Sequence, residues 1–317
     1  MDAAVQGYTF FFDWEPELIQ NLQQGAGTVG KALTRVFAFI GDQPFTIIVL
    51  MVVLFLWRKE SGKRLVIPVM TATLGFAMVK NLFFRLRPYM AHPDKIAIWQ
   101  LPETDAAPMD VLQQGYSFPS GHSAMSTALY GTLARDVRKK WMWCLAVLVP
   151  LCVGISRFIV GAHYPTDVLA GWAMGLLGIG FSILLEKTVK SIRMRYLILT
   201  AITLPGLFWC NSRDYFAAFG FLLGLMAALE FEKKYVRFED TRNPLQMLLR
   251  FVGAVAAYVI LNKLTKMPFS TEFMNNGTLA SNMVRLARYV ILGFVMIGVY
   301  PMTFRLYARI GKQPAKE

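Results

Sequence analysis

Residues 141–185 read WMWCLAVLVPLCVGISRFIVGAHYPTDVLAGWAMGLLGIGFSILL, two apolar segments joined by a short polar turn. The segments, near 141–159 and 165–185, are each long enough to cross a hydrocarbon layer of roughly 30 Å as an α-helix. The turn between them carries Arg157, His163 and Asp167. The sequence therefore predicts two membrane helices joined by a turn that carries charged and titratable side chains.

Apolar segments of this kind recur along the chain. Of its 317 residues, 55% are hydrophobic and 17% are charged, and the mean hydropathy is +0.43. Soluble domains usually carry about 25% charged residues. The sequence predicts an all-α fold, a polytopic transmembrane helical bundle of about nine spans. The candidate spans lie near 36–57, 65–85, 119–135, 141–159, 165–185, 195–210, 214–230, 245–262 and 284–308.

The N-terminal part differs in character from the spans. Between Tyr8 and Leu22, aromatic and aliphatic residues alternate with acidic ones such as Glu15. This pattern is typical of an interfacial helix lying on the bilayer, or of a peripheral piece of the bundle. No basic stretch precedes it, so we expect no signal peptide. Within the first span, the run from Gly41 to Pro44 predicts a break or restart of the helix.

The distribution of charge predicts the orientation. A net charge of +13 would suggest nucleic acid in a soluble protein, but in a membrane protein it is typical of the positive-inside bias, and we expect no nucleic-acid partner. Basic residues cluster in alternate loops near 58–64, 135–140, 187–195, 233–250 and 305–316. We predict that these loops and the C-terminus are cytoplasmic and that the N-terminus and the polar turns face the other side. The three cysteines show no metal-binding or disulfide spacing.

A first polar run lies at the end of the span near 65–85 and reads Lys80-Asn-Leu-Phe-Phe-Arg-Leu-Arg87-Pro88. Lys80 and Arg87 are seven residues apart, which on one helix places both on one side, with Pro88 ending the helix. A lysine inside an apolar run costs several kcal/mol to bury, so it indicates a functional site. The alternative for Lys80 is snorkelling of its ammonium to the interface.

A second run, Phe118-Pro119-Ser120-Gly121-His122, predicts the start of a helix with Pro119 at its first position. A helix N-terminus attracts anions, Gly121 permits close approach of the backbone to a phosphate, and Ser120 can donate its hydroxyl. His122 projects from the same turn. Taken alone, this run also fits an ordinary capped helix start.

The third run is the turn quoted first. Pro165 suits a helix start, which places His163 at the cap and Asp167 in the first turn. That spacing lets Asp167 accept the Nδ1–H of His163 and leaves Nε2 as a nucleophile, the arrangement of a base and its orienting carboxylate. With the three cations, the two histidines could hold a phosphoryl group, attack it and protonate the departing oxygen.

The three runs together resemble the type 2 phosphatidic acid phosphatase superfamily, the lipid phosphate phosphatases. Its pattern of K-x6-R-P, P-S-G-H and S-R-x5-H-x3-D is matched in order and without substitution, over about residues 36–185. The resemblance implies that His163 attacks phosphorus to form a phosphohistidine, that Asp167 orients it, and that His122 protonates the leaving group and then activates water. It also implies no metal or other cofactor. The groups that it implies for binding the phosphoryl oxygens are Lys80, Arg87, Arg157, the Ser120 hydroxyl and the Gly121 amide.

The chain departs from many small bacterial members of that superfamily in two ways. The sequence predicts no span ahead of the interfacial segment and about four additional spans after residue 190. We expect an N-terminal interfacial region at 1–35, a phosphatase core at 36–190 and a C-terminal extension at 191–317. The nine-span layout resembles glucose-6-phosphatases and some larger bacterial members. The added spans would shape a lipid groove, make a dimer contact or only enlarge the bundle, and the sequence indicates no oligomeric state.

Four functions are compatible with these motifs. The first is a membrane phosphatase for a lipid phosphate or diphosphate, with undecaprenyl diphosphate as the leading substrate, followed by phosphatidylglycerophosphate, phosphatidate and sphingoid phosphates. The second is a phosphatase for a soluble sugar phosphate. The third is a phosphotransferase that passes the phosphohistidine to another acceptor, and the fourth is a non-enzymatic transporter or scaffold. The complete set of motif residues favours an enzyme over the fourth.

Overall fold

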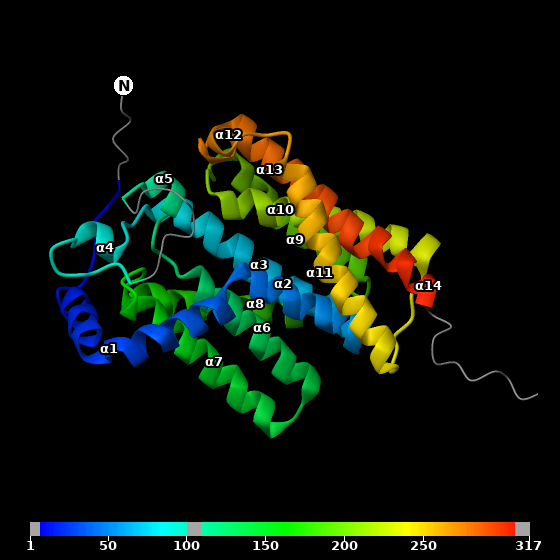
Figure 1. Ribbon diagram of the computed structural model, residues 1–317, viewed down its shortest axis with the longest axis horizontal. Coiled ribbons are helices and arrows are strands. Elements are labelled where there is room, and N and C mark those ends of the chain that lie inside the picture. Colours follow the sequence, from blue (N-terminus) through cyan, green and yellow to red (C-terminus); the bar gives the residue numbers. More distant parts are fainter. Residues whose placement is uncertain (1–6, 100–108, 308–317) are drawn as a thin grey trace, which may run out of the picture.

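The structure, a computed structural model, describes residues 7–99 and 109–307, and it is built from helices (Figure 1). The α-helices are α1 (Trp14–Gly41), α2 (Gln43–Val52), α3 (Lys59–Phe83), α4 (Pro88–Ala91), α5 (Val111–Gln114), α6 (Gly121–Val137), α7 (Lys140–Ile159), α8 (Pro165–Thr188), α9 (Ile192–Thr203), α10 (Arg213–Phe231), α11 (Pro244–Lys266), α12 (Thr271–Asn275), α13 (Leu279–Phe294) and α14 (Phe304–Tyr307). Short 3₁₀ or π segments are η1 (Val53–Trp57), η2 (Leu204–Phe208), η3 (Glu232–Val236), η4 (Val295–Val299) and η5 (Tyr300–Thr303).

Six of these helices are long and apolar enough to cross a membrane, so the predicted helical membrane bundle is confirmed. They cover Lys59–Phe83, Lys140–Ile159, Pro165–Thr188, Arg213–Val236, Pro244–Lys266 and Leu279–Tyr307. The helices at 14–41 and 43–57 are bent by 54° relative to each other and make a seventh span if they are counted together. The predicted count of nine is not confirmed, because α6 has 17 helical residues and α9 has 12.

The N-terminal helix belongs to the packed bundle. Glu15 and Ile19 of α1 are fully buried, so an interfacial helix resting only on lipid is not confirmed. The helix kinks at Gly27, whose φ of +55° is the left-handed region that glycine tolerates. It ends at Gly41, and α2 begins after Asp42, whose carboxylate accepts the Gln43 N–H at 2.7 Å. The break predicted between Gly41 and Pro44 is therefore confirmed.

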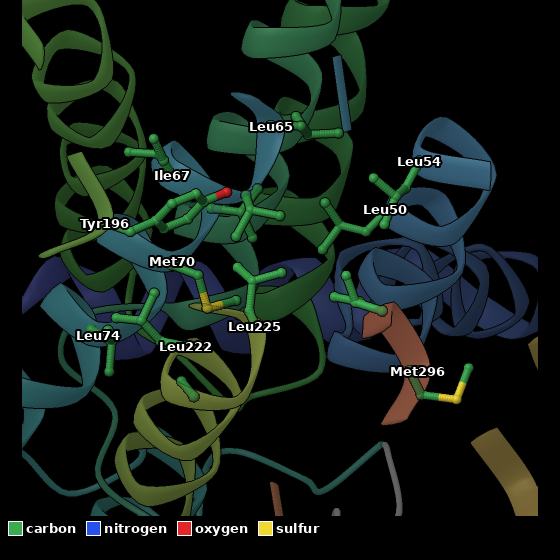
Figure 2. Packing of buried hydrophobic residues seen from close by; sticks show 14 of the residues in the cluster. Leu50, Leu54, Leu65, Ile67, Met70, Leu74, Tyr196, Leu222, Leu225 and Met296 are labelled. Carbon is green, nitrogen blue, oxygen red and sulfur yellow. The ribbon is translucent and has the colours of Figure 1, made fainter. Parts of the chain in front are cut away.

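Helix α3 connects the two halves of the molecule. It packs against α6 and α8 on one side and against α9 and α10 on the other (Figure 1). A single cluster of buried apolar side chains continues from α3 into the C-terminal helices, including Leu74 of α3, Leu222 and Leu225 of α10, and Met296 of η4 (Figure 2). The C-terminal helices are thus fixed to the motif-bearing helices by a shared core.

Helices α10 and α13 approach each other through glycines. A Cβ built on Gly220 would lie 2.3 Å from the Leu286 carbonyl oxygen, and one built on Gly224 would lie 2.2 Å from the Val290 carbonyl oxygen. Small residues at such positions allow helix backbones to pack closely within a membrane. The position of α13 beside α10 therefore depends on Gly220 and Gly224.

We expect the substitution Gly224→Leu to lower the thermal stability of the detergent-purified protein, because the new side chain separates α10 from α13. Overpacking of this kind usually costs about 1–3 kcal/mol. Gly180→Leu on α8 is the matched control, since a Cβ there meets no atom within 4 Å. Equal melting temperatures for the two variants would contradict this account of the interface.

Candidate active site

The three sequence motifs meet at one end of the bundle. Lys80 lies near the end of α3, His122 in the first turn of α6, and His163 directly before α8. Together with Arg87 and Gly121, these residues line a cavity of about 500 Å³. The other predicted site residues, Ser120, Arg157 and Asp167, do not line this cavity, and at most 2% of each is exposed.

Backbone contacts join the motifs to one another. The Ser120 N–H donates to the Asp167 carbonyl at 2.9 Å, and the Ser117 N–H donates to the Arg85 carbonyl at 2.8 Å. Gly171 of α8 packs against the second motif so closely that a Cβ would lie 2.5 Å from the Ser120 carbonyl oxygen. The start of α6 is therefore held against the start of α8, which brings His122 and His163 to the same cavity.

The first motif is not a single helix, and this prediction was wrong. Helix α3 ends at Phe83, because Phe84 adopts the left-handed region with a φ of +48° and turns the chain. Arg87 then caps the short helix α4, and Pro88 begins that helix instead of ending the previous one. Proline favours this position because its φ is preset and its missing N–H is not needed there. Lys80 and Arg87 still reach one cavity, through the turn of the chain.

Lys80 and Arg87 both contact neutral groups. The Arg87 guanidinium donates to the carbonyl oxygens of Gly115 at 3.1 Å and Gln114 at 2.5 Å. The Lys80 ammonium lies 5.5 Å from the centre of the Phe76 ring. Both side chains line the cavity, and these contacts help to orient them.

The second motif caps α6 through Ser120 and not through Pro119. The Ser120 hydroxyl accepts the Ser123 N–H at 3.4 Å and the Ser123 hydroxyl at 3.0 Å. Pro119 therefore lies ahead of the cap, and its predicted place at the first helical position is wrong. A Cβ on Gly121 would lie 2.8 Å from the Phe76 ring. The absence of a side chain at Gly121 thus permits close packing of α6 on α3.

Sequence reasoning missed Asp42, which is also part of the cavity wall. Its Oδ1 lies 3.9 Å from Nε2 of His122. The pattern at 41–44 indicated a helix break, and an aspartate at such a break is read first as a cap. Its contact with His122 depends on the packing of α2 beside α6, which the local sequence does not indicate.

The third motif turns sharply between α7 and α8. Gly161 has a φ of +79°, a conformation that favours glycine, and the His163 N–H donates to the Arg157 carbonyl at 3.3 Å. Pro165 is the first residue of α8, as predicted, and Asp167 lies in its first turn. The cap residue is Tyr164, one position later than the predicted His163.

Asp167 lies beside the imidazole of His163. Its Oδ2 is 3.6 Å from the His163 Nδ1 and accepts the Tyr164 N–H at 2.7 Å. A separation of 3.6 Å is within ion-pair range but is too long for a hydrogen bond. The spacing of four residues thus places carboxylate and imidazole together, with Nδ1 toward the carboxylate. The orienting role of Asp167 stays a prediction.

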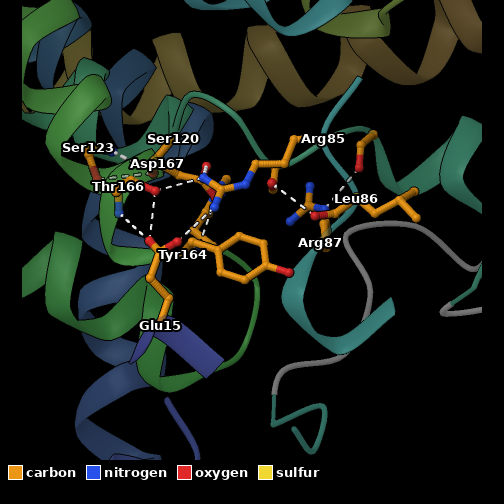
Figure 3. Close-up of polar contacts among 12 residues, drawn as sticks. Glu15, Arg85, Leu86, Arg87, Ser120, Ser123, Tyr164, Thr166 and Asp167 are labelled. Carbon is orange, nitrogen blue, oxygen red and sulfur yellow. Dashed lines mark hydrogen bonds and ion pairs between the residues drawn. The ribbon is translucent and has the colours of Figure 1, made fainter. Parts of the chain in front are cut away.

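Arg85 links this carboxylate to the N-terminal helix (Figure 3), and sequence reasoning missed it. Its guanidinium donates to Asp167 Oδ1 at 2.7 Å, to Glu15 Oε2 at 2.9 Å and to the Thr166 hydroxyl at 2.7 Å. Glu15 Oε1 in turn accepts the Thr166 N–H at 2.9 Å. All three charged side chains are at most 2% exposed. The only feature of the sequence that could have indicated Arg85 is its place in the first motif, as a third cation beside Lys80 and Arg87.

The Tyr164 ring covers this network. Its centre lies 4.0 Å from the Arg85 guanidinium carbon, a cation–π contact. Burial raises the pKa of the Tyr164 phenol well above its usual range, against the opposing effect of Arg85. The phenol therefore stays neutral at physiological pH and adds no charge to the site.

Within 7–99 and 109–307, no three His, Cys, Asp or Glu side chains lie close enough together to form a metal ligand set.

Two family models match this chain. The PAP2 superfamily model matches residues 64–191, which include every predicted site residue. A second model, described as the transmembrane extension of PAP2 superfamily phosphatases, matches residues 216–312. The motif-bearing helices and the C-terminal helices are therefore both recognised as parts of the same superfamily.

Individual relatives each match part of the chain. An undecaprenyl-diphosphatase of Sulfolobus acidocaldarius is 30% identical over 139 residues, 44% of this chain and 61% of the relative. Phosphatidylglycerophosphatase B of Bacillus subtilis is 38% identical over 82 residues, 23% of this chain and 40% of the relative. The chain thus matches less than two thirds of the length of either. The crystal structure of Aquifex aeolicus LpxE aligns at a TM-score of 0.42 and 24% identity, covering 54% of this chain and 96% of that one. On the two family matches, this chain is an integral membrane protein that belongs to the PAP2 superfamily.

Proposed function

We propose that this protein is a membrane phosphatase that hydrolyses a lipid phosphate or diphosphate through a phosphohistidine. The observation that supports this most is the convergence of Lys80, Arg87, His122 and His163 on one cavity at the ends of apolar helices. A substrate whose tail lies in the bilayer can present its headgroup at such a site. Undecaprenyl diphosphate is our leading substrate, and the relative in Sulfolobus acidocaldarius carries the name of that activity.

In the proposed reaction, Lys80 and Arg87 on the cavity wall and the buried Arg157 stabilise the negative charge that develops on the phosphoryl oxygens. Preorganised charge of this kind is usually the largest contribution to catalysis. His163 Nε2 forms a bond to phosphorus while the bond from phosphorus to the leaving oxygen breaks. His122 donates the proton that the leaving oxygen takes up. Asp167, beside Nδ1, stabilises the positive charge on the modified imidazole.

The second half-reaction releases phosphate. A water molecule gives a proton to His122 and attacks phosphorus, and the bond from phosphorus to His163 Nε2 breaks. Both histidines return to their starting protonation states, so the cycle balances without another reactant. The Gly121 amide and the Ser120 hydroxyl complete the proposed set of phosphate contacts. In its contacts with Ser123 the Ser120 hydroxyl only accepts, so its own hydrogen can still be donated to the phosphate.

We further propose that the chain crosses the membrane nine times, with α6 and α9 as short spans and the active site on the extracytoplasmic side. The basic loops near 58–64, 135–140 and 187–195 connect the helix ends opposite to the site, which is the positive-inside pattern for a cytoplasmic C-terminus. Trp14 and Leu18 of α1 are exposed on the side of the active site. We place the first half of α1 at that interface and keep 1–35, 36–190 and 191–317 as the three regions.

Phosphate release by the purified protein from a substrate panel tests the proposal. The panel contains undecaprenyl diphosphate, phosphatidylglycerophosphate, phosphatidate, sphingosine phosphate and glucose 6-phosphate. We expect turnover of at least one lipid. Turnover of glucose 6-phosphate alone would assign the site to soluble sugar phosphates. A phosphorylated acceptor without free phosphate would indicate a phosphotransferase.

We expect EDTA to leave the rate unchanged and vanadate to inhibit. The proposed positive charge comes from three basic side chains, so removal of divalent ions should not affect it. Vanadate mimics the phosphoryl group in its five-coordinate transition state and should bind at His163. The same phosphate-release assay measures both effects. Loss of activity with EDTA that Mg²⁺ restores would show that the proposed mechanism is incomplete.

A further inference from the structure

The active-site cavity extends beyond the three motifs. Its far wall is formed by the C-terminal helices that the second family model matches. Four basic residues of those helices line it, and we call them the extension site: Arg213, Lys266, Arg285 and Arg288. A volume of about 500 Å³ is within the range of pockets that hold whole small molecules, so the cavity has room for more than one phosphate.

The fold brings these four cations to the same end of the bundle as the catalytic residues. Arg213 is the first residue of α10, and Lys266 is the last residue of α11. Arg285 and Arg288 lie three residues apart in the middle of α13 and so share one face of that helix. Electrostatic repulsion acts between Arg285 and both Arg213 and Arg288, and between Lys266 and both α13 arginines. The four residues are therefore one cluster.

Only some of the hydrogen-bond donors of this cluster have acceptors among the described residues. Arg288 is 3% exposed, and its Nη2 donates to Asn262 Oδ1 at 3.1 Å, but its buried Nε and Nη1 have no acceptor among the described residues. Arg285 donates from Nη2 to the Met274 carbonyl at 2.6 Å, and its buried Nε likewise has none. Buried donors without acceptors are rare and costly, and these belong to cations on a cavity wall.

The acidic residues that the structure describes do not balance the cluster. Among described residues, no carboxylate lies within ion-pair distance of the four cations. Asp110 and Asp214 act on Arg213 at longer range, and Asp214 also acts on Arg285. The described part of the wall therefore carries more positive than negative charge. A bound anion would supply the missing acceptors and the missing charge at once.

We propose that the extension site binds a second phosphate of the same lipid whose terminal phosphate is cleaved at His163. This inference rests on the proposed function and narrows it, because it assigns to the enzyme a lipid headgroup that carries two phosphates. The shared cavity lets both phosphates of such a headgroup bind side by side. The extension site would then select the substrate, while the residues of the three motifs would carry out the reaction.

Phosphatidylglycerophosphate and phosphatidate of identical acyl chains test this assignment. Both end in a cleavable phosphate, but only the first has an additional phosphodiester. We expect the wild-type kcat/KM to favour phosphatidylglycerophosphate. Lys266→Gln and Arg285→Gln should each lower the ratio of the two kcat/KM values by about tenfold, mainly through the KM for phosphatidylglycerophosphate. Lys266 is exposed at the cavity, so its variant should fold even if an arginine variant does not.

Lys263→Gln is the matched control, since Lys263 is exposed on the same turn of α11 but does not line the cavity. A ratio within twofold of wild type in both test variants would overturn the assignment. Loss of inhibition by added inorganic phosphate, with an unchanged ratio, would assign the site to free phosphate and also overturn it. If the wild type cleaves neither lipid, it is the proposed function that fails, and the two failures are thereby distinguished.

Discussion

Replacement of His163 with alanine is expected to abolish turnover while the protein still folds and inserts. The proposed reaction has no other nucleophile at this point of the cavity, so kcat should fall by at least about 10³-fold. The imidazole lines a cavity instead of filling the apolar core, so its loss should change the melting temperature little. Phosphate release and thermal unfolding of the same detergent preparation measure both quantities.

His92→Ala is the control for this experiment. The His92 ring packs against Phe11 at a centroid distance of 4.5 Å, near Tyr164, and does not line the cavity. Burial lowers the pKa of His92, against the raising effect of Asp94, so the imidazole is neutral at pH 7 and its loss removes no positive charge from the site. We expect nearly wild-type kcat. Equal losses of activity in the two variants would contradict the assignment of His163 as nucleophile.

The second large effect is expected for Arg85→Ala. Its guanidinium lies between two buried carboxylates, those of Glu15 and Asp167, and both would lose their ion pair. Removal of one partner from a buried pair usually destabilises a protein by about 3–5 kcal/mol. We also expect a lower kcat, because Asp167 lies beside His163 and would be drawn toward water or protonated. Chemical or thermal unfolding and steady-state kinetics measure the two losses.

Arg193→Ala provides the matched control. Arg193 pairs with Glu230 at 3.9 Å on the surface, where an ion pair contributes about 0–1 kcal/mol. Arg85→Lys is a second comparison, because lysine keeps the charge but lacks the planar fork that reaches two carboxylates. It should recover part of the stability and less of the activity. Equal melting temperatures for Arg85→Ala and Arg193→Ala would show that the network of Glu15, Arg85 and Asp167 does not stabilise the site.

The sequence predicted the features that depend on local chemistry. Apolar length predicted the membrane helices, and preset proline geometry predicted the start of α8 at Pro165. The break after Gly41 was also predicted, because it is marked by residues that end and cap helices. Five of the eight residues that the motifs propose for the site line one cavity, and their roles stay predictions.

Features that depend on distant parts of the chain were not predicted. Glu15 binds Arg85, which lies 70 residues further along the chain, and nothing in the N-terminal pattern indicates that partner. The left-handed conformation of Phe84 separates Lys80 from Arg87, although phenylalanine carries no signal for it. The direction of Arg285 and Arg288 toward the cavity follows from the glycine packing of α13 on α10, which sets the rotation of that helix.

The most direct test of the account is to trap the phosphorylated enzyme. Purified protein is mixed with lipid substrate that carries a radiolabelled terminal phosphate, quenched in alkali within the first turnover, and digested for peptide mapping. The account predicts label on the peptide that contains His163, its transfer to inorganic phosphate during a chase, and no label in His163→Ala. Full turnover without any labelled protein, or label on His122, would contradict it.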